Sequence, residues 1–94
     1  MRFEWDVNKA GGNLAKHGVS FEAAATVFGD ALSDTFDDPD HSAEELRFII
    51  VGVSGRGRIL VAAHTDDGET VRIISAREPT RVERVFYEES RARD

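Results

Sequence analysis

The sequence predicts an α+β fold in one domain covering residues 1–94, with two helices before an antiparallel sheet and one helix after it. Three observations lead to this prediction. A chain of 94 residues has the length of one domain. Apolar residues recur at helical spacing before residue 30 and after residue 80. The segment between them alternates with a period of two and is divided by short turns. The predicted element order is β-α-α-β-β-β-β-α.

The N-terminal part begins with a short strand over residues 1–5 and continues with two helices. Asp6 and Ser20 are expected to be N-caps, because their side-chain oxygens can accept the free N–H groups of a first helical turn. Gly18 and Gly29 are expected to end the two helices. Each helix has one apolar stripe: Val7, Ala10, Leu14 and His17 on the first, and Phe21, Ala24, Ala25 and Phe28 on the second.

Four strands follow the helices. The loops between the last three are short, so these strands are expected to be antiparallel neighbours. The second of the four is apolar on both faces, as a central strand should be. The predicted strands cover residues 31–36, 46–53, 58–65 and 69–76, with turns at 54–57 and 66–68.

The closing helix begins after Pro79, which cannot continue the hydrogen-bond ladder of a sheet. Thr80 and Glu83 match a capping box, in which each side chain accepts a backbone N–H from the other residue. The helix is predicted to turn one apolar face inward and to gather three polar side chains on another face. The inward residues are Val82, Val85 and Phe86, and the other face carries Arg84, Tyr87 and Arg91.

The composition is that of an ordinary globular protein, with 40% hydrophobic and 32% charged residues and no Cys. Without Cys, the chain has neither a disulfide framework nor a thiolate metal site. No apolar run has the length of a signal peptide core or of a membrane helix. The expected location is therefore the cytoplasm, away from membranes.

Charge is distributed unevenly along the chain. The formal net charge is −6, but residues 30–45 contain seven acids and no Lys or Arg, which leaves 11 acidic against 12 basic residues elsewhere. A local positive surface can therefore form, because binding follows the local field rather than the net charge. The acidic segment is either a solvated loop and strand edge or a docking surface for a basic partner. Its acids are Asp30, Asp34, Asp37, Asp38, Asp40, Glu44 and Glu45.

The candidate functional residues are cations and protic groups. His17, His41 and His64 lack the spacing of a metal pair, so no metal or other cofactor is expected. RNA cleavage without a metal needs a base for the 2′-OH, an acid for the leaving 5′-oxygen and positive charge around the phosphate. Guanidinium groups suit the last role, because they can hold two phosphate oxygens at once. The candidates are Arg77, Arg81 and Arg84 at the strand-to-helix corner, Tyr87 one turn after Arg84, and Lys16 and His17 at the end of the first helix.

Each candidate also has a purely structural interpretation, which the sequence leaves open. These interpretations are an ion pair of Arg77 with Glu78 or Asp6, a pair of Arg84 with Glu88, solvation of Arg81, a favourable helix-end charge for Lys16, a partly buried position for His17, a place within the sheet for His64, and a core-edge position for Tyr87.

Three blocks of residues, in order along nearly the whole chain, carry a resemblance to a known family. The first block joins residues 3–6 to residues 13–21, which include Lys16-His17-Gly18-Val19-Ser20-Phe21. The second covers residues 24–28 and Asp30. The third is Arg72-Ile73-Ile74-Ser75-Ala76-Arg77, followed by Thr80, Arg81, Glu83, Arg84 and Tyr87. Together these blocks resemble the BrnT family of toxins.

The resemblance implies a RelE-like fold and a metal-independent endoribonuclease that inhibits translation as the toxin of a type II toxin–antitoxin system. It also implies a cognate antitoxin with a ribbon-helix-helix DNA-binding domain, so that DNA is contacted only through the antitoxin. The positions carried over from the family are Lys16, His17, Arg77, Arg81, Arg84 and Tyr87. The arginines are assigned to phosphate, and Tyr87 or His17 to proton transfer.

A rival interpretation comes from the residues just after Arg77. Glu78 and Pro79 stand where the family often has basic or small residues, and Glu78 could neutralise part of the positive surface. The alternative function is therefore a catalytically weak or inactive toxin-like module that acts by binding a partner protein.

Overall fold

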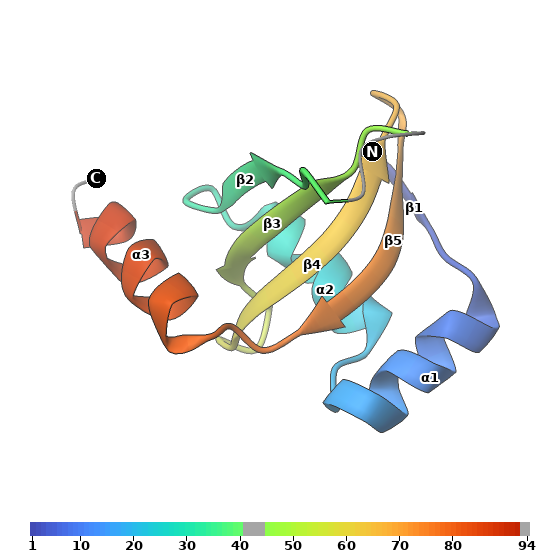
Figure 1. Cartoon of the computed structure of the whole chain (residues 1–94), viewed down its shortest axis with the longest axis horizontal. Helices are drawn as coiled ribbons and strands as arrows, with labels where there is room; N and C mark the ends of the chain where they lie inside the picture. Colours follow the sequence, from blue (N-terminus) through green and yellow to red (C-terminus); the bar gives the residue numbers. More distant parts are fainter. Residues whose placement is uncertain (41–44, 93–94) are drawn as a thin grey trace.

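The computed structural model describes residues 1–40 and 45–92 and has the predicted order of elements (Figure 1). Within those two ranges, no helix is long and apolar enough to cross a lipid bilayer. The elements are β1 (Arg2–Glu4), α1 (Val7–His17), α2 (Phe21–Thr26), the short 3₁₀ helix η1 (Val27–Gly29), β2 (Asp34–Asp37), β3 (Phe48–Val53), β4 (Ile59–Asp66), β5 (Thr70–Arg77) and α3 (Arg81–Ala92).

The five strands form one sheet in the order β1-β5-β4-β3-β2. The pairs β2–β3, β3–β4 and β4–β5 are antiparallel, as predicted. β1, however, is parallel to β5, so the sheet is mixed rather than wholly antiparallel. A tight turn makes two strands antiparallel, but no such turn joins β1 to β5, because residues 5–69 lie between them.

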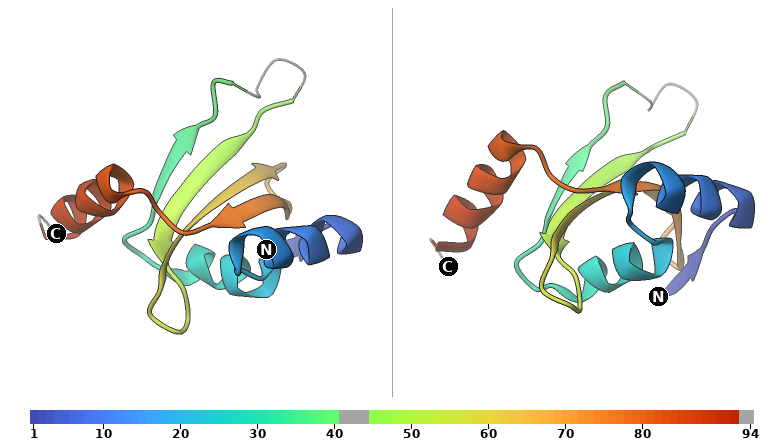
Figure 2. Two further views of the ribbon diagram at one scale, coloured as in Figure 1. Left: turned by 60° about the horizontal axis from the view of Figure 1, so that its bottom comes forward. Right: turned by 90° about the horizontal axis from the view of Figure 1, so that it is seen from below.

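The two faces of the sheet are covered by different helices (Figure 2). The main core lies under α1 and α2, where Ile50 of β3 and Ala62 of β4 pack with residues of α2. The opposite face carries Val51 and Val61, and there only Tyr87 of α3 completes a small buried cluster. We call this second side the open face, because α3 covers only part of it.

The N-caps of the two N-terminal helices lie where the sequence predicts them. Asp6 Oδ1 accepts the backbone N–H of Lys9 at 2.9 Å, and Ser20 Oγ accepts that of Ala23 at 3.0 Å. Gly18 ends α1 with a φ of 69°, a left-handed conformation that glycine adopts without steric cost. These local signals are sufficient to set the beginning of both helices and the end of α1.

The predicted apolar stripe of α1 is wrong. Val7 is 79% exposed and Leu14 is 51% exposed, whereas Asn13 is the buried residue of this helix. The Asn13 amide nitrogen donates to the carbonyls of Val19 (2.9 Å) and Ala76 (2.8 Å), and its oxygen accepts the N–H of Ala76 (3.1 Å). A polar side chain therefore holds α1 against β5, which an apolar periodicity cannot reveal.

Two boundaries differ from the prediction around residue 30. α2 ends at Thr26, and a 3₁₀ turn continues to Gly29. β2 begins at Asp34 rather than at residue 31, because Asp30 closes a tight turn first. Its side chain accepts the N–H of Leu32 at 2.9 Å, and its carbonyl accepts that of Ser33 at 3.1 Å.

The predicted inward face of α3 is also wrong. Val82, Val85 and Phe86 are 78%, 43% and 50% exposed, whereas Tyr87 is fully buried. Phe86 lies at the edge of the sheet, where its ring centroid is 5.6 Å from that of Phe36 in β2. α3 contacts the sheet through a narrow strip centred on Tyr87, an aromatic residue with a polar hydroxyl group. The apolar periodicity of the helix therefore does not identify its buried side.

Candidate functional site

Arg77 lies at the end of β5 and forms an ion pair with Glu83 at the strand-to-helix corner. Its Nη1 donates to Glu83 Oε1 at 2.7 Å and its Nη2 donates to Glu83 Oε2 at 3.0 Å, which is a two-pronged carboxylate pair. This hydrogen bonding raises the pKa of Arg77, although burial acts against it. The partner is neither Glu78 nor Asp6, the two acids considered from the sequence.

Glu83 has two tasks at this corner. It completes the predicted capping box, since Thr80 N–H donates to Glu83 Oε1 at 2.8 Å and Glu83 N–H donates to Thr80 Oγ1 at 3.2 Å. The hydrogen bonds from Arg77, and then those from Thr80, lower the pKa of Glu83 to about 2 despite its partial burial. Glu83 is therefore ionised at neutral pH and fixes Arg77 to the first turn of α3.

The other two arginines of the corner lie on α3 rather than on β5. Arg81 and Arg84 are exposed, and the described part of the chain provides no ion pair for either of them. The pair of Arg84 with Glu88 that the sequence allows is not formed. Both cations can therefore meet a ligand from solvent.

Tyr87 points into the protein. Its hydroxyl donates to Asp30 Oδ2, an oxygen that also accepts the backbone N–H of Val53 at 2.9 Å. Burial and the bond to Asp30 raise the pKa of Tyr87 to about 12. The phenol is thus neutral at physiological pH and is occupied in anchoring α3, which matches the structural interpretation of this residue rather than a site open to solvent.

Lys16 and His17 lie on the other side of the end of β5. Both are exposed in the last turn of α1. The bonds between Asn13 and Ala76 hold this turn beside the residue that precedes Arg77. No hydrogen bond or ion pair connects either side chain with the corner arginines within the described residues. The structure therefore brings Lys16 and His17 to the same end of the molecule as Arg77.

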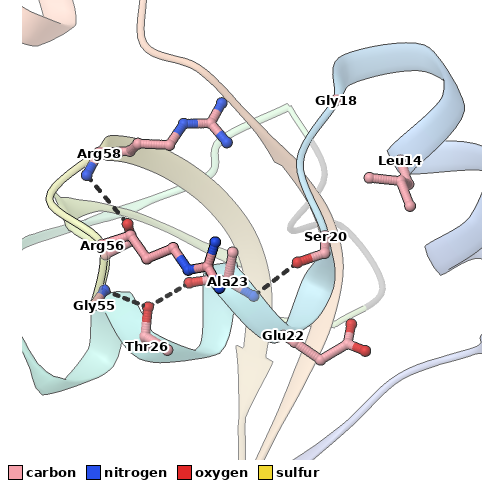
Figure 3. A pocket seen from close by; sticks show the side chains of 10 residues that line it. Leu14, Gly18, Ser20, Glu22, Ala23, Thr26, Gly55, Arg56 and Arg58 are labelled. Atoms are coloured by element: carbon pink, nitrogen blue, oxygen red, sulfur yellow. Dashed lines mark hydrogen bonds between the residues drawn. The ribbon is translucent and has the colours of Figure 1, made fainter.

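A pocket of about 480 Å³ lies between the end of α1, α2 and the β3–β4 turn (Figure 3). Arg56 and Arg58 extend from that turn along one side of the pocket, while Leu14 and Gly18 belong to the other side. The turn is attached to α2 by a hydrogen bond from Gly55 N–H to Thr26 Oγ1 at 2.8 Å. The last turn of α1, which carries Lys16 and His17, therefore borders a second pair of arginines.

Arg58 connects this pocket to the strand-to-helix corner. Its Nη2 donates to Glu78 Oε1 at 2.9 Å, so the side chain of Glu78 pairs with Arg58 and not with Arg77. Both partners are well exposed, and such a pair contributes little to stability. We call the resulting cationic surface the basic end; in Figure 1 its elements lie along the lower side. Its members are Lys16, His17, Arg56, Arg58, Arg77, Arg81 and Arg84.

A pocket of about 300 Å³ lies on the open face of the sheet next to Arg77. Arg77 and Ser75 of β5 line it together with Arg47, which precedes β3 and pairs with Glu45 at 3.1 Å. Register explains the placement, because Arg77 pairs with Val61 and Ser75 with Ala63 across the ladder. Ile74 has no partner on β4, and this bulge turns Ser75 and Arg77 to the open face.

The acidic segment of residues 30–45 does not act as one surface. Asp38 is buried, and Asp30 and Asp34 are half-buried; Ser90 Oγ of α3 donates to Asp34 at 3.5 Å. Asp37, Asp40 and Glu45 are exposed. Glu44 lies outside the described residues, as does His41. The burial of Asp38 was not visible in the sequence.

The remaining histidine, His64, is buried between the rings of Phe28 and Phe48. Burial lowers its pKa, so this imidazole is neutral at physiological pH, and it occupies the sheet position expected from its alternation. Across the described residues, no three His, Cys, Asp or Glu side chains gather in a way that could hold a metal ion.

Sequence reasoning missed three arginines and one carboxylate of this region. Arg56 was interpreted only as part of a turn, and Arg58 and Arg47 only as residues at the beginning of predicted strands. The strand register could have indicated Arg58. The strand that follows Arg58 runs antiparallel to the strand that ends at Arg77, so Arg58 lies beside the residues that follow Arg77. Glu83 was recognised as a cap but not as the partner of Arg77, since one side chain performs both tasks.

Comparisons with known proteins agree with this geometry. The crystal structure of the ribonuclease toxin BrnT of Brucella abortus is similar in fold, with a TM-score of 0.66 and 24% sequence identity over 86% of this chain and 99% of that chain. Comparison with curated proteins gives no match. The family model described as the ribonuclease toxin BrnT of type II toxin–antitoxin systems matches residues 5–83. The resemblance noted in the sequence is thereby confirmed, and the chain belongs to the BrnT family of ribonuclease toxins.

Proposed function

We propose that this protein is a metal-independent endoribonuclease that binds RNA at the basic end and inhibits translation in the cytoplasm. The observation that carries the proposal is the placement of Arg77, a fixed and partly exposed guanidinium at the border of a pocket, in a chain of a ribonuclease toxin family. Arg81 and Arg84 continue the positive charge along α3. Such an arrangement suits the phosphates of an RNA strand.

The proposed reaction uses the RNA's own 2′-OH. The 2′-oxygen attacks the adjacent phosphorus while a base takes its proton, and the 5′-oxygen leaves with a proton from an acid. The products are a 2′,3′-cyclic phosphate and a 5′-OH. Arg77 stabilises the charge on the phosphate. His17 is the proton-transfer candidate that is exposed at this end, with Lys16 beside it. Tyr87 can take part only after α3 moves, because its hydroxyl is buried on Asp30.

The test is cleavage of RNA by the purified protein and by two arginine variants of the same strand. Arg77→Ala is expected to lower the cleavage rate by about 100-fold or more, as expected for loss of a charged group that stabilises a transition state. Arg72→Ala is the matched control, since Arg72 is an exposed arginine at the opposite end of β5. RNA carrying 2′-O-methyl groups should not be cleaved. Equal loss of activity in both variants, or cleavage of the methylated RNA, would refute the proposal.

A binding module without cleavage is the second candidate. It is favoured by the sealed position of Tyr87 and by the carboxylate already bound to Arg77. Under this function, induced expression would leave growth and purified RNA unaffected, while the protein would still bind its antitoxin. Growth arrest that Arg77→Ala relieves, with the variant folded, would eliminate it.

The toxin–antitoxin family implies an antitoxin partner. We expect it to carry a ribbon-helix-helix DNA-binding domain and to cover α3. The helix offers Val82, Val85 and Phe86 to solvent, and exposed acids of the 30–45 segment, such as Asp37, favour a basic partner. Hydrogen exchange of the complex should show protection of α3 or of the acidic segment. A complex that protects neither would contradict this expectation.

A further inference from the structure

Arg77 uses only part of its hydrogen-bonding capacity in the ion pair with Glu83. A guanidinium has five N–H donors in one plane. Two are bound to the Glu83 carboxylate, and Nη1 also donates to the carbonyl of Glu78 at 3.2 Å. Within the described residues, Nε and the second N–H of Nη2 have no acceptor. These two donors lie on one edge of the guanidinium, which is the spacing that a phosphate or carboxylate accepts with two oxygens.

We infer that Glu83 is a positioning residue that orients Arg77, so that the free Nε–Nη2 edge binds the scissile phosphate while the Arg77–Glu83 pair remains intact. The inference rests on the proposed ribonuclease function and names a further residue of the same site. Glu83 itself does not touch the RNA.

The fixed geometry of Glu83 supports this role. Its carboxylate is held at the start of α3 by the N–H of Thr80 at 2.8 Å, so the pair joins the end of β5 to a helix terminus rather than to a mobile side chain. Paired donors and acceptors leave the guanidinium plane little freedom to rotate. Arg77 also lines the open-face pocket with Ser75. A phosphate there would meet an arginine that is already oriented.

The competing possibility is that Glu83 occupies the phosphate's place and must leave when RNA binds. That exchange would break two charge-assisted hydrogen bonds and leave an ionised carboxylate next to an anionic phosphate. Binding at the free edge breaks none of these bonds. The geometry therefore favours an Arg77–Glu83 pair that stays intact when RNA binds over a pair that opens to admit the phosphate. The two possibilities predict opposite effects on RNA cleavage when the Glu83 charge is removed.

Glu83→Gln separates them, because glutamine keeps one hydrogen bond to Arg77 and the shape of the capping box but loses the carboxylate. We expect the single-turnover cleavage rate to fall about tenfold from imperfect orientation. Affinity for a 2′-O-methyl RNA should change by less than about threefold. Glu88→Gln removes the same charge from an exposed position of α3 and should change neither quantity. Tighter RNA binding together with equal or faster cleavage in Glu83→Gln would overturn the inference and identify Glu83 as a competitor.

A second measurement keeps this inference apart from the proposed function. In the wild-type protein, the NMR signal of the Arg77 Nε–H should shift on titration with the 2′-O-methyl RNA; this signal is assigned by its absence from the spectrum of Arg77→Lys, which has no guanidinium. Absence of RNA cleavage by the wild-type protein would refute the ribonuclease proposal. A silent Nε–H signal would refute the role of this edge, even in a protein that cleaves RNA.

Discussion

Asn13 shows how much a single buried polar residue contributes. Its amide satisfies the carbonyl of Val19 and both backbone groups of Ala76, and so connects the segment after α1 to β5. Asn13→Ala would leave these buried groups without partners. We expect the free energy of unfolding to fall by about 2–4 kcal/mol, measured by urea denaturation.

Asn8 provides the matched control, since it lies exposed on the same helix. Asn8→Ala should change the free energy of unfolding by no more than about 0.5 kcal/mol. Asn13→Asp keeps the size of the side chain but loses the amide donor, so it should resemble Asn13→Ala rather than the wild type. A stable Asn13→Asp protein would show that the donor bonds to Val19 and Ala76 matter less than the bond from Ala76 N–H.

At the scale of elements, α3 depends on a small number of anchors. Tyr87 bonds to Asp30, and its ring completes the small buried cluster with Val51 and Val61 on the open face. Tyr87→Phe keeps the ring but removes the bond to a carboxylate. We expect a loss of about 1.5–3 kcal/mol in the free energy of unfolding. Hydrogen exchange should become faster in α3, whereas β4 should exchange as before.

The hydrogen bond between Tyr87 and Asp30 also predicts that the free energy of unfolding depends on pH. Burial alone would raise the pKa of Asp30, but hydrogen bonds from Tyr87 and from the backbone N–H groups of Val53 and Leu32 outweigh it and lower the pKa below 3.8. The stabilisation is therefore present above pH 3.8 and is lost as the pH falls through the lower, folded-state value. The difference in unfolding free energy between wild type and Tyr87→Phe should shrink as the pH falls below that value. A constant difference down to pH 2 would show that Asp30 is not the titrating partner.

The elements that the sequence predicts well are those with local signals. Caps at Asp6 and Ser20 and the capping box at Thr80 depend on residues within one helical turn, and all three are confirmed. Inward faces depend on what lies opposite in the fold. Of the three helix faces predicted from apolar spacing, that of α2 is confirmed, because Phe21 and Ala24 are buried in the main core. Those of α1 and α3 were wrong, because the true anchors are the polar groups of Asn13 and Tyr87.

The candidate site was likewise predictable only in part. The residue types that could carry out the chemistry were recognisable in the sequence, and the resemblance to a family indicated Arg77 and its neighbours. Their pairings were not visible, because the bond from Arg77 to Glu83 depends on the bend between β5 and α3. The turn arginines, Arg56 and Arg58, join the surface only through the register of β4 beside β5.

At the scale of the whole molecule, charge is separated along the sheet. The basic end gathers at the β3–β4 turn, the end of β5 and the end of α1, whereas the β4–β5 turn at the opposite end carries Asp66 and Asp67 (Figure 1). A protein with a net charge of −6 can thus still offer a cationic surface to an anionic strand at one end. Under the proposed function, we expect this separation to orient RNA before any specific contact forms.

The salt dependence of RNA binding tests this separation. Each phosphate that a cation neutralises releases counterions, so the affinity for a 2′-O-methyl RNA should fall with salt on a logarithmic plot with a slope set by the number of contacts. Replacing Arg56 and Arg58 together by Ala should reduce that slope by about one, since each single-strand contact contributes about 0.7 and Arg58 already shares its charge with Glu78. Arg2→Ala is the control, because Arg2 lies near Asp67 at the opposite end. If Arg2→Ala lowers the slope as much as the double variant does, RNA does not select the basic end, and charge separation along the sheet has no part in how this toxin finds its substrate.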